Sequence, residues 1–312
     1  EYADDDFPSE AVGGLFNRLM LGQSTTAVTG LTLAESTLEL LYPTPAAAPP
    51  ATGVGGLAGV MSNAGGAART AACRGITLRN TQITGPYAAG GLLGRTVLAK
   101  KAAALELTDC TYTGLTLTGG QYAGGYVGEL QGGSVAGVGT TAASLVLGSA
   151  STITVDGPAG APNGLAGGLF GLAAASVKVG PEEEGKTLVL QDVQVLSTRA
   201  QKPTDDNSYG VGGIAGKAQN TLEVRRCRLE NMTLTGGAEN ATLASGQYVR
   251  AGGLASYTVK SVLAEDCTLS CLRASGVNAG GLVGKGEQGF TVRRCTVSGT
   301  DTDRTLIAGA YG

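Results

Sequence analysis

The sequence predicts an all-β fold, a parallel β-helix (β-solenoid) of about eight three-strand coils with loop insertions. Three observations predict it. A phrase centred on two glycines recurs along the chain, the segments after it alternate with the period of a β-strand, and the composition favours small side chains. The 312 residues include 52 glycines, no tryptophan, no histidine and 4 phenylalanines, which suits a structure whose backbone passes close to itself many times.

The double-glycine phrase has eight copies. The first reads Val12-Gly-Gly-Leu-Phe16 and the eighth reads Ala279-Gly-Gly-Leu-Val-Gly284. Two adjacent glycines permit a tight bend or close packing against a facing strand. Residues 307–312 resemble a ninth, degraded copy. The repeat glycines are Gly13, Gly14, Gly55, Gly56, Gly90, Gly91, Gly124, Gly125, Gly167, Gly168, Gly212, Gly213, Gly252, Gly253, Gly280 and Gly281.

A second phrase follows each copy and alternates apolar with polar residues before it reaches a small one. Examples are Leu105-Glu-Leu-Thr-Asp-Cys110 and Leu222-Glu-Val-Arg-Arg-Cys227. A third, weaker strand often follows, as in residues 115–119 and 232–236. A period of two with many Val, Leu, Ile and Thr residues indicates strands rather than helices. The pattern therefore predicts coils of three short strands, stacked in parallel along one axis.

Five of the six cysteines are assigned to one small-residue position of the repeat. Stacked coils would join them into a row of small buried side chains, and Ser36, Ala150 and Val193 are assigned to the same position in other copies. Free thiols are favoured, because side chains in register point the same way and fit disulfide geometry poorly. Cys73–Cys110 and Cys267–Cys295 are the alternative bridges, and Cys271 lies outside the row. The predicted row is Cys73, Cys110, Cys227, Cys267 and Cys295.

The residues just before this position alternate in charge over the last three coils. They are Arg225-Arg226, then Glu265-Asp266, then Arg293-Arg294. Stacked coils would place Arg226, Asp266 and Arg294 as a ladder of weakly favourable cross-strand ion pairs.

We expect one solenoid domain over residues 1–312. Residues 1–11 form an acidic lead-in, and residues 12–312 hold the repeats, the last of them incomplete. Uncapped solenoid ends expose strand edges, so a second copy is an expected partner through head-to-tail pairing. Insertions rich in Pro, Gly and polar residues are expected at Tyr42–Pro50, Gly132–Thr141, Gly157–Asn163, Pro181–Lys186, Thr198–Ser208 and Gly237–Gln247.

Several classes of function find little support. The net charge is −3 with no basic stripe, so we expect no nucleic-acid partner, and no segment is long and apolar enough for membrane insertion. The glycine phrase recurs without a following helix, which argues against nucleotide binding. The cysteines are too widely spaced for a zinc site. The acidic stretches Asp4–Glu10 and Asp205–Asn207 lack calcium-loop spacing. We expect no metal and no cofactor.

An enzyme is the main alternative, because parallel β-helices also carry polysaccharide lyases and glycoside hydrolases. Such sites need clustered carboxylates on one face. Asp109, Asp192 and Asp266 are assigned to one repeat position in alternate coils, about 10 Å apart by strand spacing. Stacking alone explains these positions, so we expect no catalytic residues.

Ala-Gly-Gly-Leu-Val-Gly at residues 279–284, with its sibling phrases from Val12 onward, resembles the short GLUG repeat of bacterial surface adhesins. The resemblance implies a secreted or surface-attached bacterial protein with a β-helical shaft and no catalytic site in the repeat itself. We therefore expect a non-catalytic, extracellular structural or adhesive segment. The expected partner is a second copy of the chain, or a glycan or protein on a host or bacterial surface.

Overall fold

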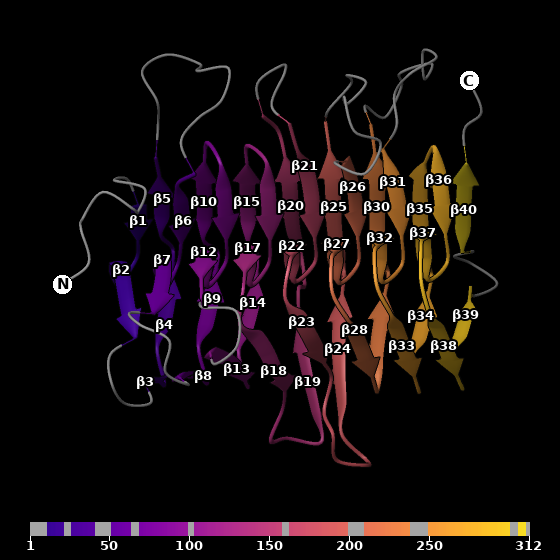
Figure 1. Ribbon diagram of the computed structural model, residues 1–312, viewed down its shortest axis with the longest axis horizontal. Helices are drawn as coiled ribbons and strands as arrows, with labels where there is room; N and C mark the ends of the chain where they lie inside the picture. Colours follow the sequence, from indigo (N-terminus) through magenta and orange to yellow (C-terminus); the bar gives the residue numbers. More distant parts are fainter. Residues whose placement is uncertain are drawn as a thin grey trace.

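The computed structural model describes residues 11–21, 26–40, 51–63, 69–98, 103–157, 162–198, 209–237, 249–299 and 305–309. These residues form 40 parallel-paired β-strands and no helix (Figure 1). Except between β14 and β19, each strand of one coil pairs with the strand five places later in the chain, so five strands make one coil and eight coils stack along the long axis. The predicted all-β parallel β-helix is confirmed.

The strands at equivalent places in successive coils form sheets that run the length of the molecule. The first sheet holds β1 (Ala11–Gly13), β6 (Gly53–Gly55), β11 (Ala88–Gly90), β16 (Tyr122–Gly124), β21 (Gly164–Gly167), β26 (Tyr209–Gly212), β31 (Arg250–Gly252) and β36 (Asn278–Gly280). The second holds β2 (Phe16–Leu21), β7 (Ala58–Asn63), β12 (Leu93–Val97), β17 (Val127–Gln131), β22 (Phe170–Ala173), β27 (Ala215–Ala218), β32 (Ala255–Thr258) and β37 (Val283–Gly286). The third holds β3 (Thr26–Thr29), β8 (Arg69–Arg74), β13 (Ala103–Thr108), β18 (Ser134–Gly139), β23 (Ser176–Val179), β28 (Leu222–Arg225), β33 (Val262–Glu265) and β38 (Phe290–Arg293).

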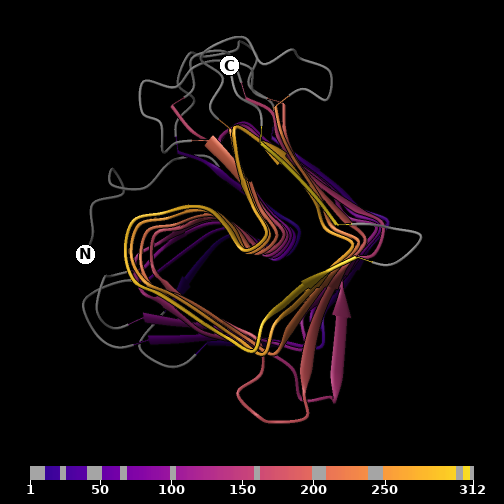
Figure 2. The same ribbon diagram turned by 90° about the vertical axis from the view of Figure 1, so that its right-hand side faces the viewer.

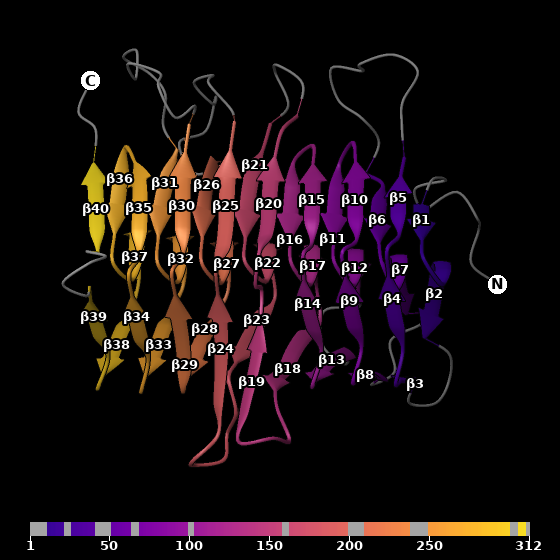
Figure 3. The ribbon, with the colours of Figure 1, turned by 180° about the vertical axis from the view of Figure 1, so that it is seen from behind.

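The fourth strands divide into two groups. One holds β4 (Thr32–Ala34), β9 (Thr77–Arg79) and β14 (Thr111–Thr113), and the other holds β19 (Ser144–Leu147), β24 (Thr187–Gln191), β29 (Cys227–Glu230), β34 (Thr268–Ser270) and β39 (Thr296–Ser298). The fifth sheet, whose strands lie side by side in Figure 3, holds β5 (Thr37–Glu39), β10 (Gln82–Gly85), β15 (Thr116–Gly119), β20 (Ser151–Val155), β25 (Val193–Ser197), β30 (Thr233–Gly236), β35 (Arg273–Gly276) and β40 (Leu306–Gly309).

Each coil has five strands where the sequence pattern predicted three, because two of the three phrases are bent. The glycine pair divides the first phrase between the first and second sheets. A corner divides the second phrase, and Asp109, Arg226 and Asp266 stand there with φ of 54°, 50° and 55°. A residue in this left-handed region turns the chain sharply and ends a strand.

The two glycines of each pair are needed for different reasons. A Cβ on the first, such as Gly124, would lie 2.1 Å from the Val127 carbonyl oxygen of the same coil. A Cβ on the second, such as Gly125, would lie 2.1 Å from the Gly168 carbonyl oxygen of the next coil. The first glycine therefore allows the bend within a coil, and the second allows one coil to stack on the next.

Two expected insertions lie within the described residues. Residues 134–139 of the first form strand β18, so that segment is not a loop. The second, Pro181–Lys186, connects β23 to β24, and β19 and β24 extend beyond the other strands at the lower edge of Figure 1. The other insertions lie wholly or mostly outside the described residues, as does the acidic lead-in apart from Ala11.

The segment expected to begin a ninth copy instead completes the eighth coil. Strand β40 pairs with β35, which places Ile307 opposite Ala274 and Gly309 opposite Gly276. This segment shares with the double-glycine phrase only its small apolar residues and its glycine. The strands of the fifth sheet contain such residues too, as Ala274 and Gly276 on β35 show.

The interior is a continuous core of Leu, Val, Ile, Ala and Cys side chains. In its middle coils Tyr112 and Tyr126 are fully buried and their rings meet edge to face, with centroids 5.9 Å apart. The Tyr112 hydroxyl donates to the Gly168 carbonyl at 2.6 Å, which satisfies the buried phenol.

The outer surface bends inward between the first and second sheets, as Figure 2 shows along the axis. Charged side chains are buried in this bend. Arg95 on β12 and Glu129 on β17 form an ion pair at 2.5 Å. Tyr87 and Gln131 also donate to Glu129 at 3.3 and 2.6 Å. The buried carboxylate is thus fully compensated, as a charge in a low-dielectric site must be.

Candidate functional site

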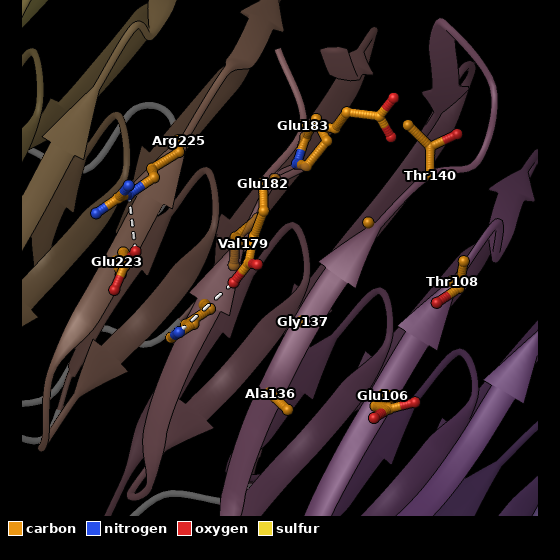
Figure 4. Close-up of a pocket in the computed structure, with 14 residues that line it drawn as sticks. Glu106, Thr108, Ala136, Gly137, Thr140, Val179, Glu182, Glu183, Glu223 and Arg225 are labelled. Atoms are coloured by element: carbon orange, nitrogen blue, oxygen red, sulfur yellow. Dashed lines mark ion pairs between the residues drawn. The ribbon is translucent and has the colours of Figure 1, made fainter. Parts of the chain in front are cut away.

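A trough of about 350 Å³ lies on the outer surface over the third sheet (Figure 4). It crosses strands β13, β18, β23 and β28, and the connection between β23 and β24 forms one wall. This volume lies within the range of small-ligand sites, roughly 300–1,000 Å³. Its lining is Glu106, Thr108, Ala136, Gly137, Gly139, Thr140, Lys178, Val179, Gly180, Pro181, Glu182, Glu183, Glu223 and Arg225.

Strand register explains why these side chains meet. Glu106 pairs with Gly137, and Lys178 pairs with Glu223, so each pair faces the same side of the sheet. The ladder between β13 and β18 shifts register at Leu105/Glu106, and the ladder between β18 and β23 shifts at Val135/Val138. These irregularities place small residues on the floor of the trough, as bulges often do near binding sites.

The charges of the trough are paired. Lys178 contacts Glu182 at 3.6 Å, and the Arg225 Nε lies 2.7 Å from Glu223. The other two lining carboxylates pair with cations that lie outside the trough. Glu106 contacts Arg74 at 3.5 Å, and Glu183 contacts Lys186 at 2.6 Å. The lining itself carries four carboxylates and two cations, and two further cations beside it, Arg74 and Lys186, balance the remaining charge.

Two corner residues hold the wall of the trough. The Arg226 Nη1 donates to the backbone carbonyls of Pro181 and Glu182 at 3.3 and 2.9 Å. Asp109 accepts from the Thr140 hydroxyl and from the Thr141 backbone N–H, both at 2.8 Å. Burial opposes ionisation of Asp109, but the hydrogen bonds from Thr141 and Thr140 outweigh it and hold its pKa below the usual value.

The three aspartates considered for catalysis do not share one position. Asp109 and Asp266 stand at the corner that follows the third sheet, whereas Asp192 stands between β24 and β25. Asp192 accepts from the Asn231 side chain at 3.0 Å. The expected row of carboxylates is therefore absent, because each of these coils has two left-handed corners, as at Asp266 and Cys271 in the seventh, and Asp192 stands at the second of them.

The charge ladder is present at one of its two steps. Arg294 contacts Asp266 at 2.5 Å and Glu265 at 2.9 Å, and its hydrogen bond lowers the pKa of Asp266. Arg226 instead contacts the backbone of the trough wall, and Arg225 reaches Glu265 at 3.5 Å. Arg225 thus supplies the cation that the sequence pattern assigned to Arg226.

The cysteines occupy more than one row. Leu229 pairs with Leu269, and Leu269 pairs with Val297, which aligns Cys227, Cys267 and Cys295 two residues earlier. Thr111 pairs with Thr77, so Ile76 rather than Cys73 is equivalent to Cys110.

Cys73 lies opposite Leu107 and Val28 instead. The corner glycine Gly75, which precedes Ile76 as Asp109 precedes Cys110, is the sequence signal that would have aligned these coils correctly. In the fifth coil, the residue equivalent to Cys227 is Leu188, which lies opposite it, and not Val193. All six cysteines are free thiols, and the two candidate bridges are not formed.

The sequence alone did not single out the trough. Its carboxylates look like ordinary surface charges, and only the course of residues 180–186 brings Glu182 beside Lys178. Across the described ranges, no cluster of three or more His, Cys, Asp or Glu side chains could hold a metal ion. Nor does that part of the chain contain a helix that could span a membrane.

No protein-family profile, curated protein or solved structure matches this chain.

Proposed function

We propose that this chain is a non-catalytic, extracellular structural or adhesive segment of a bacterial surface protein, and that its copies assemble end to end. The resemblance of its double-glycine phrase to the GLUG repeat supports this proposal. The roles of the repeated positions also support it, since glycines stack coils, cysteines and leucines fill the interior, and corner residues turn the chain.

The observation that supports end-to-end assembly is the exposure of apolar side chains on the first and eighth coils. Val297 in the eighth coil is 40% exposed, whereas Leu269, its partner in the seventh, is fully buried. Val292 is 49% exposed, and its partner Ala264 is 1% exposed. At the other end Leu15 and Phe16 are 48% and 36% exposed, whereas Ala58, the partner of Phe16 in the second coil, is fully buried. Full burial of such a side chain contributes roughly 1.5–3 kcal/mol.

A second copy fits these surfaces because each inner coil already accepts a coil of the same shape. In the described part of the chain, the strands of the first and eighth coils stand at the edges of their sheets (Figure 1). Pairing the first coil of one copy with the eighth of another would continue the ladder and the core together. Such a head-to-tail contact does not close on itself, so it leads to filaments.

A carbohydrate-active enzyme is the second candidate, and the carboxylate-lined trough is the observation that favours it. The test is incubation of the purified chain with a panel of neutral and acidic polysaccharides, followed by assays for new reducing ends and for unsaturated products. We expect no product above the background of a heat-denatured sample. Turnover that is lost in Glu223→Gln would replace the structural role with a catalytic one.

A further inference from the structure

We propose that the trough on the third sheet binds a short stretch of neutral carbohydrate without cleaving it. This inference rests on the proposed adhesive function and names its ligand class. The trough is lined by strands β13, β18, β23 and β28 and by residues 180–183.

The floor of the trough leaves room for a sugar ring. Ala136, Gly137 and Gly139 lie there, and a Cβ added to Gly137 would meet nothing within 4 Å. Gly137 pairs with Glu106, whose side chain lines the trough, so a side chain at Gly137 would enter the same space. The backbone of β18 can therefore be approached closely from outside.

The polar lining matches hydroxyl groups better than ions. Each sugar hydroxyl both donates and accepts hydrogen bonds, and the pairs Lys178–Glu182 and Arg225–Glu223 present a donor beside an acceptor. Thr108 adds a hydroxyl to the same lining, whereas the hydroxyl of Thr140 already donates to Asp109. Because the charges are already balanced, an anionic or cationic ligand would have to displace an existing partner.

The length of the trough also favours a chain over a single small molecule. From Glu106 on β13 to Glu223 on β28 the lining crosses three strand spacings, about 14 Å. A few linked sugar rings lying parallel to the solenoid axis would contact all four strands.

The same spacing argues against cleavage. Glycosidases hold their two carboxyl groups roughly 5–10 Å apart on either side of the bond that breaks. Glu106 and Glu223, the two carboxylates based on the sheet itself, lie on strands about 14 Å apart, and Glu106 contacts Arg74 on the side away from Glu223. The remaining carboxylates, Glu182 and Glu183, extend from the connecting segment, where they pair with Lys178 and Lys186. The trough is therefore suited to hold a chain and release it unchanged.

The test is titration of the full chain, by NMR or calorimetry, with neutral tetrasaccharides of glucose, mannose, galactose and xylose. Tetragalacturonate and tetralysine are titrated in parallel as charged probes. We expect at least one neutral tetrasaccharide to bind with a dissociation constant that changes less than twofold between 50 and 500 mM salt, because little net charge is involved.

Two variants locate the binding. Gly137→Leu fills the trough while leaving every charge in place, and we expect at least tenfold weaker binding. Glu223→Gln removes one acceptor, and we expect roughly tenfold weaker binding. The matched control is Glu230→Gln, which disrupts the similar Arg228–Glu230 pair on β29, outside the trough. It should bind as the parent does, and thermal melting verifies the fold of each variant.

Three results would overturn the inference: no binding of any neutral tetrasaccharide, undiminished binding by folded Gly137→Leu, or preferential binding of tetralysine or tetragalacturonate. None of these results would bear on the proposals of end-to-end assembly and of a non-catalytic role, because those are tested by separate measurements. Cleavage of a bound tetrasaccharide would instead refute the non-catalytic function.

Discussion

Thiols and phenols inside the solenoid are held in their neutral forms. Burial raises the pKa of Cys73 to about 12, with a further contribution from the neighbouring Cys110. Burial likewise raises the pKa values of Cys110 and Cys267 to about 11. The buried phenols of Tyr112 and Tyr126 also have raised pKa values, because a phenolate would lose its hydration there.

Stability should therefore fall in alkaline solution. A raised folded-state pKa favours the neutral thiol, so its contribution is complete below the ordinary thiol value of 9.0 and is lost as pH rises through about 11–12. We expect the urea midpoint of unfolding to be constant from pH 7 to 8.5 and to decline from pH 9 to 11. Replacing Cys73 by valine should make the decline shallower. A midpoint that stays constant to pH 11 would contradict this assignment.

At the scale of single elements, the double-glycine bend joins the first sheet to the second in every coil. Its second glycine faces the backbone of the next coil. A Cβ on Gly213 would lie 2.1 Å from the Gly253 carbonyl oxygen and 2.6 Å from the Leu229 side chain. The backbone oxygen belongs to a hydrogen-bonded strand and cannot move aside without disturbing the stack.

Gly213→Ala should destabilise the protein by roughly 1–3 kcal/mol, the cost of overpacking a filled interior. The matched control is Gly137→Ala, because its Cβ would meet nothing within 4 Å. There we expect no loss, or a gain of up to about 1 kcal/mol from the stiffer unfolded chain. Thermal and urea unfolding followed by circular dichroism compares the two. Equal stability of both variants would show that the second glycine is not required for stacking.

The double glycines and the alternating segments were sufficient to predict this fold, because each follows from packing that repeats in every coil. The number of strands per coil was not predictable in the same way. Arg226, Asp266 and Arg294 adopt left-handed backbone conformations that glycine usually marks, so their residue types did not predict a corner. Gly75 marks the corner in the second coil, but Asp109 stands at the equivalent place in the third, and for that reason Cys73 was aligned with Cys110.

The trough was less predictable still. Glu106 and Glu223 lie more than a hundred residues apart, and their alignment depends on the register of four strands. The wall depends on Arg226 contacting the carbonyls of Pro181 and Glu182, a contact between coils of different length. Local sequence patterns carry no information about such a contact.

At the scale of the whole molecule, the stack has two apolar end surfaces. Phe290, Val292 and Val297 are 48%, 49% and 40% exposed on the eighth coil, and Leu15 and Phe16 are exposed on the first. In the inner coils the equivalent positions are covered, as Ala264 and Leu269 illustrate. The exposed apolar side chains of the first and eighth coils therefore favour the stacking of a further coil of the same shape on either end.

The most direct test of end-to-end assembly is the mass of the purified chain, measured by multi-angle light scattering across a hundredfold range of concentration. We predict a mass that rises with concentration beyond that of a dimer. Val292→Lys, which places a charge on the apolar end surface, should remain a monomer. Thr291→Lys, which places the same charge on the outer face of the same strand, should behave as the parent chain does. A parent chain that remains a monomer at every concentration would contradict the account.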